Sequence, residues 1–172
     1  MERRVVVRGR ARAPRGVSRP VRGPARVDAD EPFLPLMDAW FDPATPPARW
    51  VVVVGDDSDA EAALDAAAAA RDLLVVRTGD PDADALLADL SPVLGRLLDD
   101  TTPSQRRLAR LILVDGLRQA DAADVLGISR ASVSVAHARA RIHEIALLLR
   151  AVRACWTVGR TTSLTPGDTV PR

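Results

Sequence analysis

Three residues at fixed intervals in the C-terminal half of the chain limit its fold more than any other feature. They are Ala123, Gly127 and Val133, separated by four and six residues. A small residue such as alanine allows two helices to cross closely, and glycine adopts the positive φ that a tight turn between them needs. A branched apolar residue can then fill the space between the helices. The intervals therefore predict two helices joined by a tight turn, which is the helix-turn-helix arrangement.

Helix signals upstream extend this prediction to a unit of three helices within residues 101–157. Thr102 is suited to cap a first helix and Pro103 to occupy its first turn, while Gly116 is suited to end it. A second, shorter helix is expected over about residues 118–126.

The third helix is expected to be long. Ser129 is placed to cap it, and it should begin at Arg130. An apolar stripe with steps of three and four residues continues well beyond the three-helix unit. We expect this stripe either to pack on the preceding segment or to pair with its copy in a homodimer, and we favour the homodimer. The stripe consists of Ala138, Ile142, Ile145, Leu149, Val152 and Trp156.

Residues 103–141, PSQRRLARLILVDGLRQADAADVLGISRASVSVAHARAR, also resemble a known family. The Pro-x-Gln opening, the Asp-Gly-Leu turn at 115–117, the small Ala123 and the Leu-Gly-Ile-Ser-Arg run at 126–130 fall in one ungapped register. This segment resembles the helix-turn-helix of sigma-factor region 4 and of LuxR-type regulators. It is also similar to the C-terminal helix-turn-helix of SatD-like regulators. The resemblance implies a unit whose last helix enters the major groove of DNA.

The candidate DNA-contacting residues lie on the second and third helices and on the turn between them. Helical geometry, counted from a buried Val133, places some of them on the groove side of the third helix. Others are positioned for phosphate contacts that fix the register on the duplex. The full set is Gln119, Ser129, Arg130, Ala131, Ser132, Ser134, Val135 and Arg139.

Within this set, Arg130 is the candidate for base reading. Its guanidinium could bind a guanine edge in a bidentate manner or clamp a phosphate, and the sequence leaves both open. Ser134 could bond a base edge or a phosphate. Ala131 and Val135 could contact only a thymine methyl group, so we expect modest specificity for each half-site.

Residues 49–100 form an acidic segment with an α/β pattern. Ser58 and Glu61 have capping-box spacing at the start of its first helix. A strand, a helix and a second strand in this order favour a parallel βαβ unit, which is too small to stand alone. We expect it to dimerise or to pack on the helices that follow it. The expected elements are a strand at 50–54, a helix at 59–71, a strand at 73–76 and a helix at 81–98 that is interrupted at 91–92.

The flanking residues 1–48 and 158–172 are predicted to be a basic N-terminal tail with a linker and a disordered C-terminal tail. Residues 1–30 contain nine arginines against three acids and are rich in proline and glycine, which favours disorder. This tail is interpreted as a DNA-binding arm, as a solvated tail, or as sequence upstream of the true start. Residues 51–100 contain twelve acids against three arginines. The acidic segment is therefore also a candidate to shield the basic helices.

Neither a metal site nor catalytic chemistry is indicated. The chain has one cysteine, Cys155, and two histidines, His137 and His143, which do not share a face with it. Asp56 and Asp57 follow the first strand, but no glycine-rich phosphate loop accompanies them, so helix capping and solubility are the expected roles. We therefore expect no cofactor and no enzymatic activity.

The sequence thus predicts a mainly α fold with a small α/β part and a C-terminal helix-turn-helix. No apolar run is long enough to span a membrane, and no export signal is seen, so a cytoplasmic location is expected. The leading hypothesis is a transcriptional regulator that binds double-stranded DNA. The alternative is an interaction module that docks on RNA polymerase or a sigma factor without reading DNA.

Overall fold

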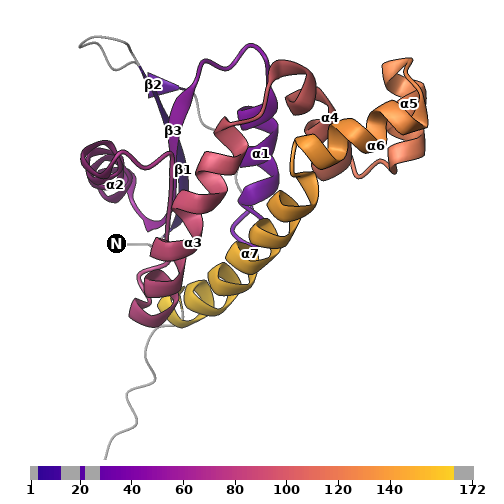
Figure 1. The fold of residues 1–172 in the computed structure, drawn as a ribbon. Coiled ribbons are helices and arrows are strands. Elements are labelled where there is room, and N and C mark those ends of the chain that lie inside the picture. The colour runs from indigo at the N-terminus through magenta and orange to yellow at the C-terminus, as the bar shows by residue number, and fades with distance from the viewer. Residues whose placement is uncertain (1–3, 13–19, 22–27, 165–172) are drawn as a thin grey trace, which may run out of the picture.

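The valine run at residues 51–54 lies in the central strand of a sheet, β3 (Ala48–Gly55), in the computed structural model. The structure describes residues 4–12, 20–21 and 28–164, and predictions for the remaining residues lie outside this range. Four strands and seven helices form within these residues (Figure 1). The other elements are β1 (Arg4–Ala11), β2 (Pro20–Val21), α1 (Phe33–Phe41), α2 (Asp57–Ala70), β4 (Leu74–Arg77), α3 (Pro81–Asp99), α4 (Pro103–Leu113), α5 (Gln119–Leu126), α6 (Arg130–Arg139) and α7 (Ile142–Leu164).

The sheet has the strand order β2-β1-β3-β4. β4 pairs parallel to β3, from Trp50 opposite Leu74 to Val53 opposite Arg77, which confirms the predicted strand-helix-strand unit. The molecule is therefore mainly helical with a small α/β part, as expected. Among the described residues, no helix combines the length and the apolar character that crossing a lipid bilayer requires.

The prediction of disorder over residues 1–30 was wrong for β1. This strand pairs antiparallel with β3 over its whole length, from Arg4 opposite Gly55 to Ala11 opposite Ala48. Its residues alternate between the two faces of the sheet, so that Val6 packs in one cluster of buried residues and Val7 in the other. The pairing gives β3 a second neighbour.

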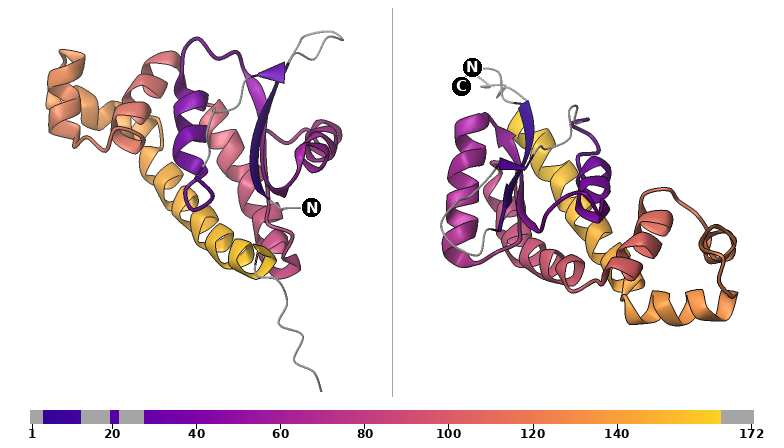
Figure 2. Two further views of the ribbon diagram at one scale, coloured as in Figure 1. Left: turned by 180° about the vertical axis from the view of Figure 1, so that it is seen from behind. Right: turned by 90° about the horizontal axis from the view of Figure 1, so that it is seen from above.

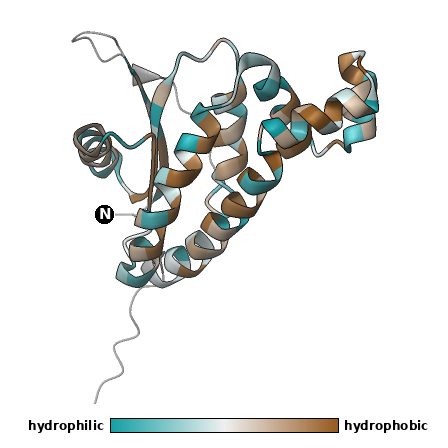
Figure 3. Cartoon of the chain, viewed as in Figure 1, coloured by the Kyte–Doolittle hydropathy of each residue, from teal (hydrophilic) through white to brown (hydrophobic). Residues whose placement is uncertain are grey.

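Helices cover both faces of the sheet (Figures 1 and 2). α2 lies on one face over a small cluster of valines, alanines and a leucine. α1, α3 and α7 lie on the other face and form the main core with the sheet. Figure 3 shows that the hydrophobic residues follow the strands and the inner faces of these helices. The cover that a small parallel unit needs is thus supplied within the chain.

The start of α2 differs from the prediction by a few residues. Asp56, and not Ser58, is the capping residue, and its carboxylate accepts hydrogen bonds from the backbone N–H groups of Ser58 and Asp59. The Asp59 carboxylate completes the capping box by accepting from the backbone N–H of Asp56 at 2.9 Å. The hydroxyl of Ser58, together with the N–H of Asp59, lowers the pKa of Asp56.

The predicted interruption of the second helix of this segment at residues 91–92 was also wrong. α3 continues through Pro92 without a break. Leu87 and Leu94, on either side of the proline, are fully buried in the main core. This burial outweighs the roughly 3 kcal/mol that an internal proline costs a helix. The buried Ser91 donates its hydroxyl to the carbonyl of Leu87 at 2.6 Å.

The predicted long third helix is two helices. α6 ends at Arg139, and Arg141 takes a left-handed conformation with φ 54° before α7 begins. The break turns the chain so that α7 runs back along α3 (Figure 1). Ala138 is exposed as a result, while Ala140 and Ile142 are buried. The expected disordered tail from residue 158 is helical as far as Leu164.

The apolar stripe of α7 packs on its own chain. Ile145, Leu149, Val152 and Trp156 are buried in the main core. The Trp156 indole donates to the carbonyl of Ala29 at 3.1 Å and stands edge-on to the Phe33 ring, with centroids 5.9 Å apart. The stripe is therefore not available to pair with a copy of itself.

Ion pairs join the basic start of the chain to the acidic segment. The arginines of β1 face the acidic surface of α2, so part of the acidic segment neutralises the N-terminal strand. The ion pairs are Arg4 and Arg8 with Asp57, at 3.0 and 2.5 Å, and Arg10 with Glu61 and Asp65, both at 2.6 Å.

Candidate nucleic-acid interface

α4 begins at a complete capping box. The backbone N–H of Thr102 donates to the Gln105 side chain at 2.8 Å, and the N–H of Gln105 donates to the Thr102 hydroxyl at 3.4 Å. Pro103 occupies the first turn, where the missing N–H costs no helical hydrogen bond. Leu108 and Ala109 are buried on the inner face of the helix. The predicted start of this helix is confirmed.

The connection between α5 and α6 is a three-residue turn at residues 127–129. Gly127 has φ 66°, and the N–H of Ile128 donates to the carbonyl of Ala123 at 3.1 Å, which closes α5 with a C-terminal cap. Ala123 and Val133 are buried between the helices, 1% and 0% exposed. Ser129 caps α6 by accepting the backbone N–H of Ser132 at 3.0 Å. These residues have the local roles that their spacing predicts.

α4, α5 and α6 pack on one another and project from the rest of the molecule (Figure 2). α4 also contacts α1, and α6 is followed by α7, so these two helices connect the projecting end to the body. The outer face of α6 is left uncovered by the described chain. All eight residues of the predicted contact set are exposed; they are Gln119, Ser129, Arg130, Ala131, Ser132, Ser134, Val135 and Arg139.

A shallow groove joins the outer face of α6 to the first turn of α4. Four of the predicted residues line it, and Gln119, Ser129, Arg130 and Ser134 do not. The groove has a volume of about 540 Å³ and is lined by Thr102, Ser104, Gln105, Ala131, Ser132, Val135, Ala136 and Arg139.

Sequence reasoning missed the contribution of α4 to this groove. Thr102, Ser104 and Gln105 form its first turn, and they place the N-terminal end of α4 next to the side chains of α6. Helix N-termini favour anions, because free N–H groups and the helix dipole point outward there. The capping-box spacing of Thr102 and Gln105 was a signal for such an end, but only the packing of the helices puts it beside α6.

The arginines of α6 differ from nine of the sixteen other arginines that the structure describes, which are paired with acids. Arg130 and Arg139 have no acidic partner within the part of the chain that the structure describes, and α6 contains no acidic residue. By contrast, Arg110 pairs with Asp38 at 2.6 Å and Arg153 with Glu31 at 3.0 Å, both toward the body. Positive charge thus remains available at both ends of α6.

The lowered pKa of His137 reduces the positive charge that this side chain brings to α6. Its side chain is half-buried, and this burial lowers its pKa. The nearby His143 lowers the pKa further, while Glu144 acts in the opposite direction.

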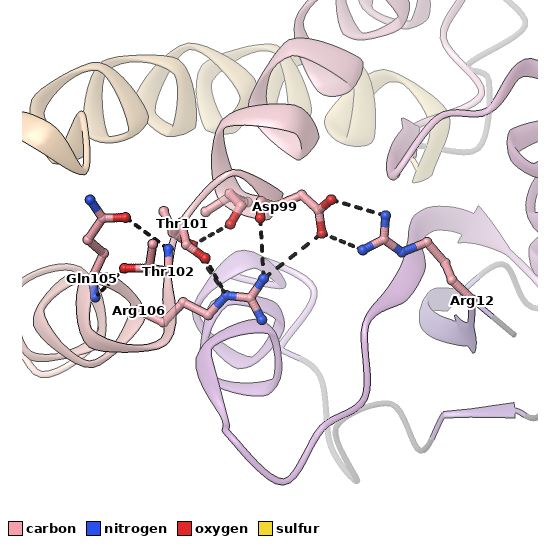
Figure 4. Close-up of polar contacts among 7 residues, drawn as sticks. Arg12, Asp99, Thr101, Thr102, Gln105 and Arg106 are labelled. Carbon is pink, nitrogen blue, oxygen red and sulfur yellow. Dashed lines mark hydrogen bonds and ion pairs between the residues drawn. The ribbon is translucent and has the colours of Figure 1, made fainter. Parts of the chain in front are cut away.

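A polar network holds α4 to the body at its first turn (Figure 4). The Asp99 carboxylate accepts two hydrogen bonds from the Arg12 guanidinium, at 2.6 and 3.0 Å. Arg106 of α4 lies 4.0 Å from the same carboxylate and donates its Nε–H to the carbonyl of Thr101 at 3.2 Å. The end of α3, the start of α4 and the residue after β1 are joined in this way.

The aspartates after β3 have structural partners. Asp56 caps α2, and capping was one of the two roles expected for it. Asp57 pairs with the arginines of β1. Within the described residues, no group of three or more histidine, cysteine or acidic side chains could hold a metal ion.

Comparison of the chain with protein-family models, with curated proteins and with solved structures gave no match.

Proposed function

We propose that the protein belongs to the class of helix-turn-helix DNA-binding proteins, with α5 and α6 as the motif and α6 as the recognition helix. Within that class, we propose that it is a cytoplasmic transcriptional regulator that reads double-stranded DNA in the major groove. Arg130 would contact a base edge or a phosphate, and Arg139 and Ser132 would contact phosphates.

One observation carries this proposal. The outer side of α6 is exposed, and the helix belongs to the projecting end and has an arginine at each of its ends, both without an acidic partner among the described residues (Figure 2). Nine of the sixteen other arginines that the structure describes are paired with acids, such as those of β1 with α2. An unpaired cationic helix on a projecting unit is what a polyanion would attract.

Selection of duplexes from a random pool, followed by fluorescence anisotropy, tests the proposal. Arg130→Ala should weaken binding of the selected duplex by about tenfold, because a bidentate arginine contact contributes roughly 1–3 kcal/mol of discrimination. The affinity should also fall steeply as the salt concentration rises.

Arg77→Ala is the matched control. Arg77 is an exposed arginine at the end of β4, and it also lacks an acidic partner among the described residues. Its removal should leave the affinity unchanged. Equal losses in the two variants would indicate non-specific attraction, and no loss in Arg130→Ala would contradict the role of α6.

A second candidate function is docking on RNA polymerase or a sigma factor without DNA reading. It is favoured by exposed apolar side chains at the projecting end, where Val125 is 55% and Ile128 is 44% exposed. Hydrophobic residues reach this end of α5 and α6 in Figure 3. Capture of polymerase by the wild-type protein, lost in Val125→Ser and accompanied by no selected duplex, would support this alternative.

We also propose that the protein forms a homodimer, through a surface other than the apolar stripe of α7. Leu86 and Val93 are 56% and 49% exposed and lie seven residues apart on α3, so they share one face of that helix. Sedimentation equilibrium of the wild type and of Leu86→Ser tests whether this face pairs.

A further inference from the structure

A cavity lies between α4 and the connection from α1 to β3, away from the groove of α6. Its volume is about 460 Å³, which is within the range of small-molecule sites. Most of its wall is apolar and stiff, because proline fixes the backbone φ. The apolar lining residues are Phe41, Pro43, Pro47 and Pro103.

One face of α4 supplies the charged side of this cavity. Arg106, Arg107 and Arg110 line it, and they share a helix face with Pro103 at intervals of three and four residues. No acidic side chain is among the lining residues. The half-buried Thr45 lines the cavity too, and its hydroxyl has no partner within the described chain.

The three arginines differ in the hydrogen-bond and ion-pair partners that they already have within the chain. Arg106 is held by Thr101 and lies near Asp99, and Arg110 pairs with Asp38. Arg107 is exposed and has no acidic partner in the described chain. An anion in the cavity would therefore find one free guanidinium and a second that can share its hydrogen-bond donors.

We propose that this cavity binds a small aromatic carboxylate. The ring would lie against Phe41 and the prolines, and the carboxylate would accept hydrogen bonds from Arg107 and Arg110. A carboxylate matches the planar fork of a guanidinium, and an aromatic body matches a preformed apolar wall. A bare inorganic anion would leave that wall without a partner.

The site also has a consequence for α6, which rests on the proposed function. α4 contacts α1 on one side and α5 and α6 on the other, so it connects the cavity to the DNA-binding end. A carboxylate that draws on Arg110 competes with Asp38 for the same guanidinium. The ligand and DNA should therefore change each other's affinity by the same factor.

Isothermal titration calorimetry with 2-naphthoate, without DNA, tests the cavity itself. Its neutral counterpart 2-naphthamide tests the need for charge, and inorganic phosphate tests the need for the ring. We expect 2-naphthoate to bind with a Kd below about 1 mM, and the amide and phosphate at least about tenfold more weakly. Arg107→Ala should weaken 2-naphthoate binding at least about fivefold, and Arg77→Ala should not change it.

Equal binding of the acid and the amide, unchanged binding in Arg107→Ala, or no binding of 2-naphthoate would overturn the proposal. Anisotropy with a selected duplex then tests the coupling: 2-naphthoate should shift DNA affinity in the wild type and not in Arg107→Ala. Unchanged DNA affinity would overturn the coupling. Site-specific binding of 2-naphthoate by a protein that selects no duplex would uphold the cavity and reject the proposed function.

Discussion

Gly127 is fixed by its backbone conformation and not by a lack of space. Its φ is 66°, and no heavy atom lies within 4 Å of the position that a Cβ would occupy. A side chain at this position therefore meets only the intrinsic strain of the left-handed region.

Gly127→Ala should lower the free energy of unfolding by about 1 kcal/mol because of this strain. Gly127→Asn should cost less than half as much, since asparagine tolerates the left-handed region. Urea denaturation of the two variants measures both values. Equal losses of unfolding free energy in the two variants would mean that the left-handed backbone conformation is not what favours glycine at this position.

His137 makes the stability depend on pH. Burial lowers its pKa in the folded chain, so the unfolded chain binds a proton more readily. The part of the free energy of unfolding that depends on a neutral His137 is fully present above the ordinary histidine pKa of 6.5. It is lost as the pH falls through that value toward the pKa of His137 in the folded chain.

The free energy of unfolding should therefore fall between roughly pH 7.5 and pH 5.5, and His137→Gln should reduce that fall. His143→Gln is the comparison, because it removes only the smaller influence on His137. It should reduce the fall less than His137→Gln does. A pH dependence that is the same in His137→Gln and the wild type would refute this assignment.

At the scale of elements, Asp99 at the end of α3 joins this helix to Arg12 after β1 and lies 4.0 Å from Arg106 of α4. Its side chain is 24% exposed and binds Arg12 through two hydrogen bonds. Asp99→Asn should destabilise the protein by about 2 kcal/mol, in the range expected for partly buried hydrogen bonds to a charged group.

Asp57→Asn is a control of the same chemistry at the surface. Asp57 also pairs with arginines, but its side chain is 53% exposed, so its loss should cost less than about 0.5 kcal/mol. Thermal and urea unfolding of both variants provides the comparison. Similar losses of unfolding free energy in the two variants would show that Asp99 does not stabilise the junction of α3, α4 and the residue after β1.

The sequence predicted those elements whose signals are local. The valine run of β3, the helix cap at Thr102 and the turn at Gly127 each depend on a few neighbouring residues. β1 was missed because its alternation is short and lies in a stretch whose average composition favours disorder. The passage of α3 through Pro92 and the break at Arg141 were missed because distant packing decides them.

At the scale of the whole molecule, the sequence predicted which segments are basic or acidic, but not which of them form ion pairs with one another. The basic start and the acidic middle were recognised from composition, yet their pairing across β1 and α2 follows from the sheet order. The same limit applies to the candidate site. The exposed residues of α6 follow from helical geometry, whereas the first turn of α4 joins them only through tertiary packing.

The central claim is that the outer face of α6 meets DNA, and photo-crosslinking tests it most directly. The photoreactive residue p-benzoylphenylalanine is placed either at Val135 on α6 or at Val158 on α7, which are 52% and 67% exposed. Both proteins are irradiated with a selected duplex. We predict covalent DNA adducts from position 135 and none from position 158. Adducts from position 158, or none from position 135 while the duplex is bound, would contradict the claim.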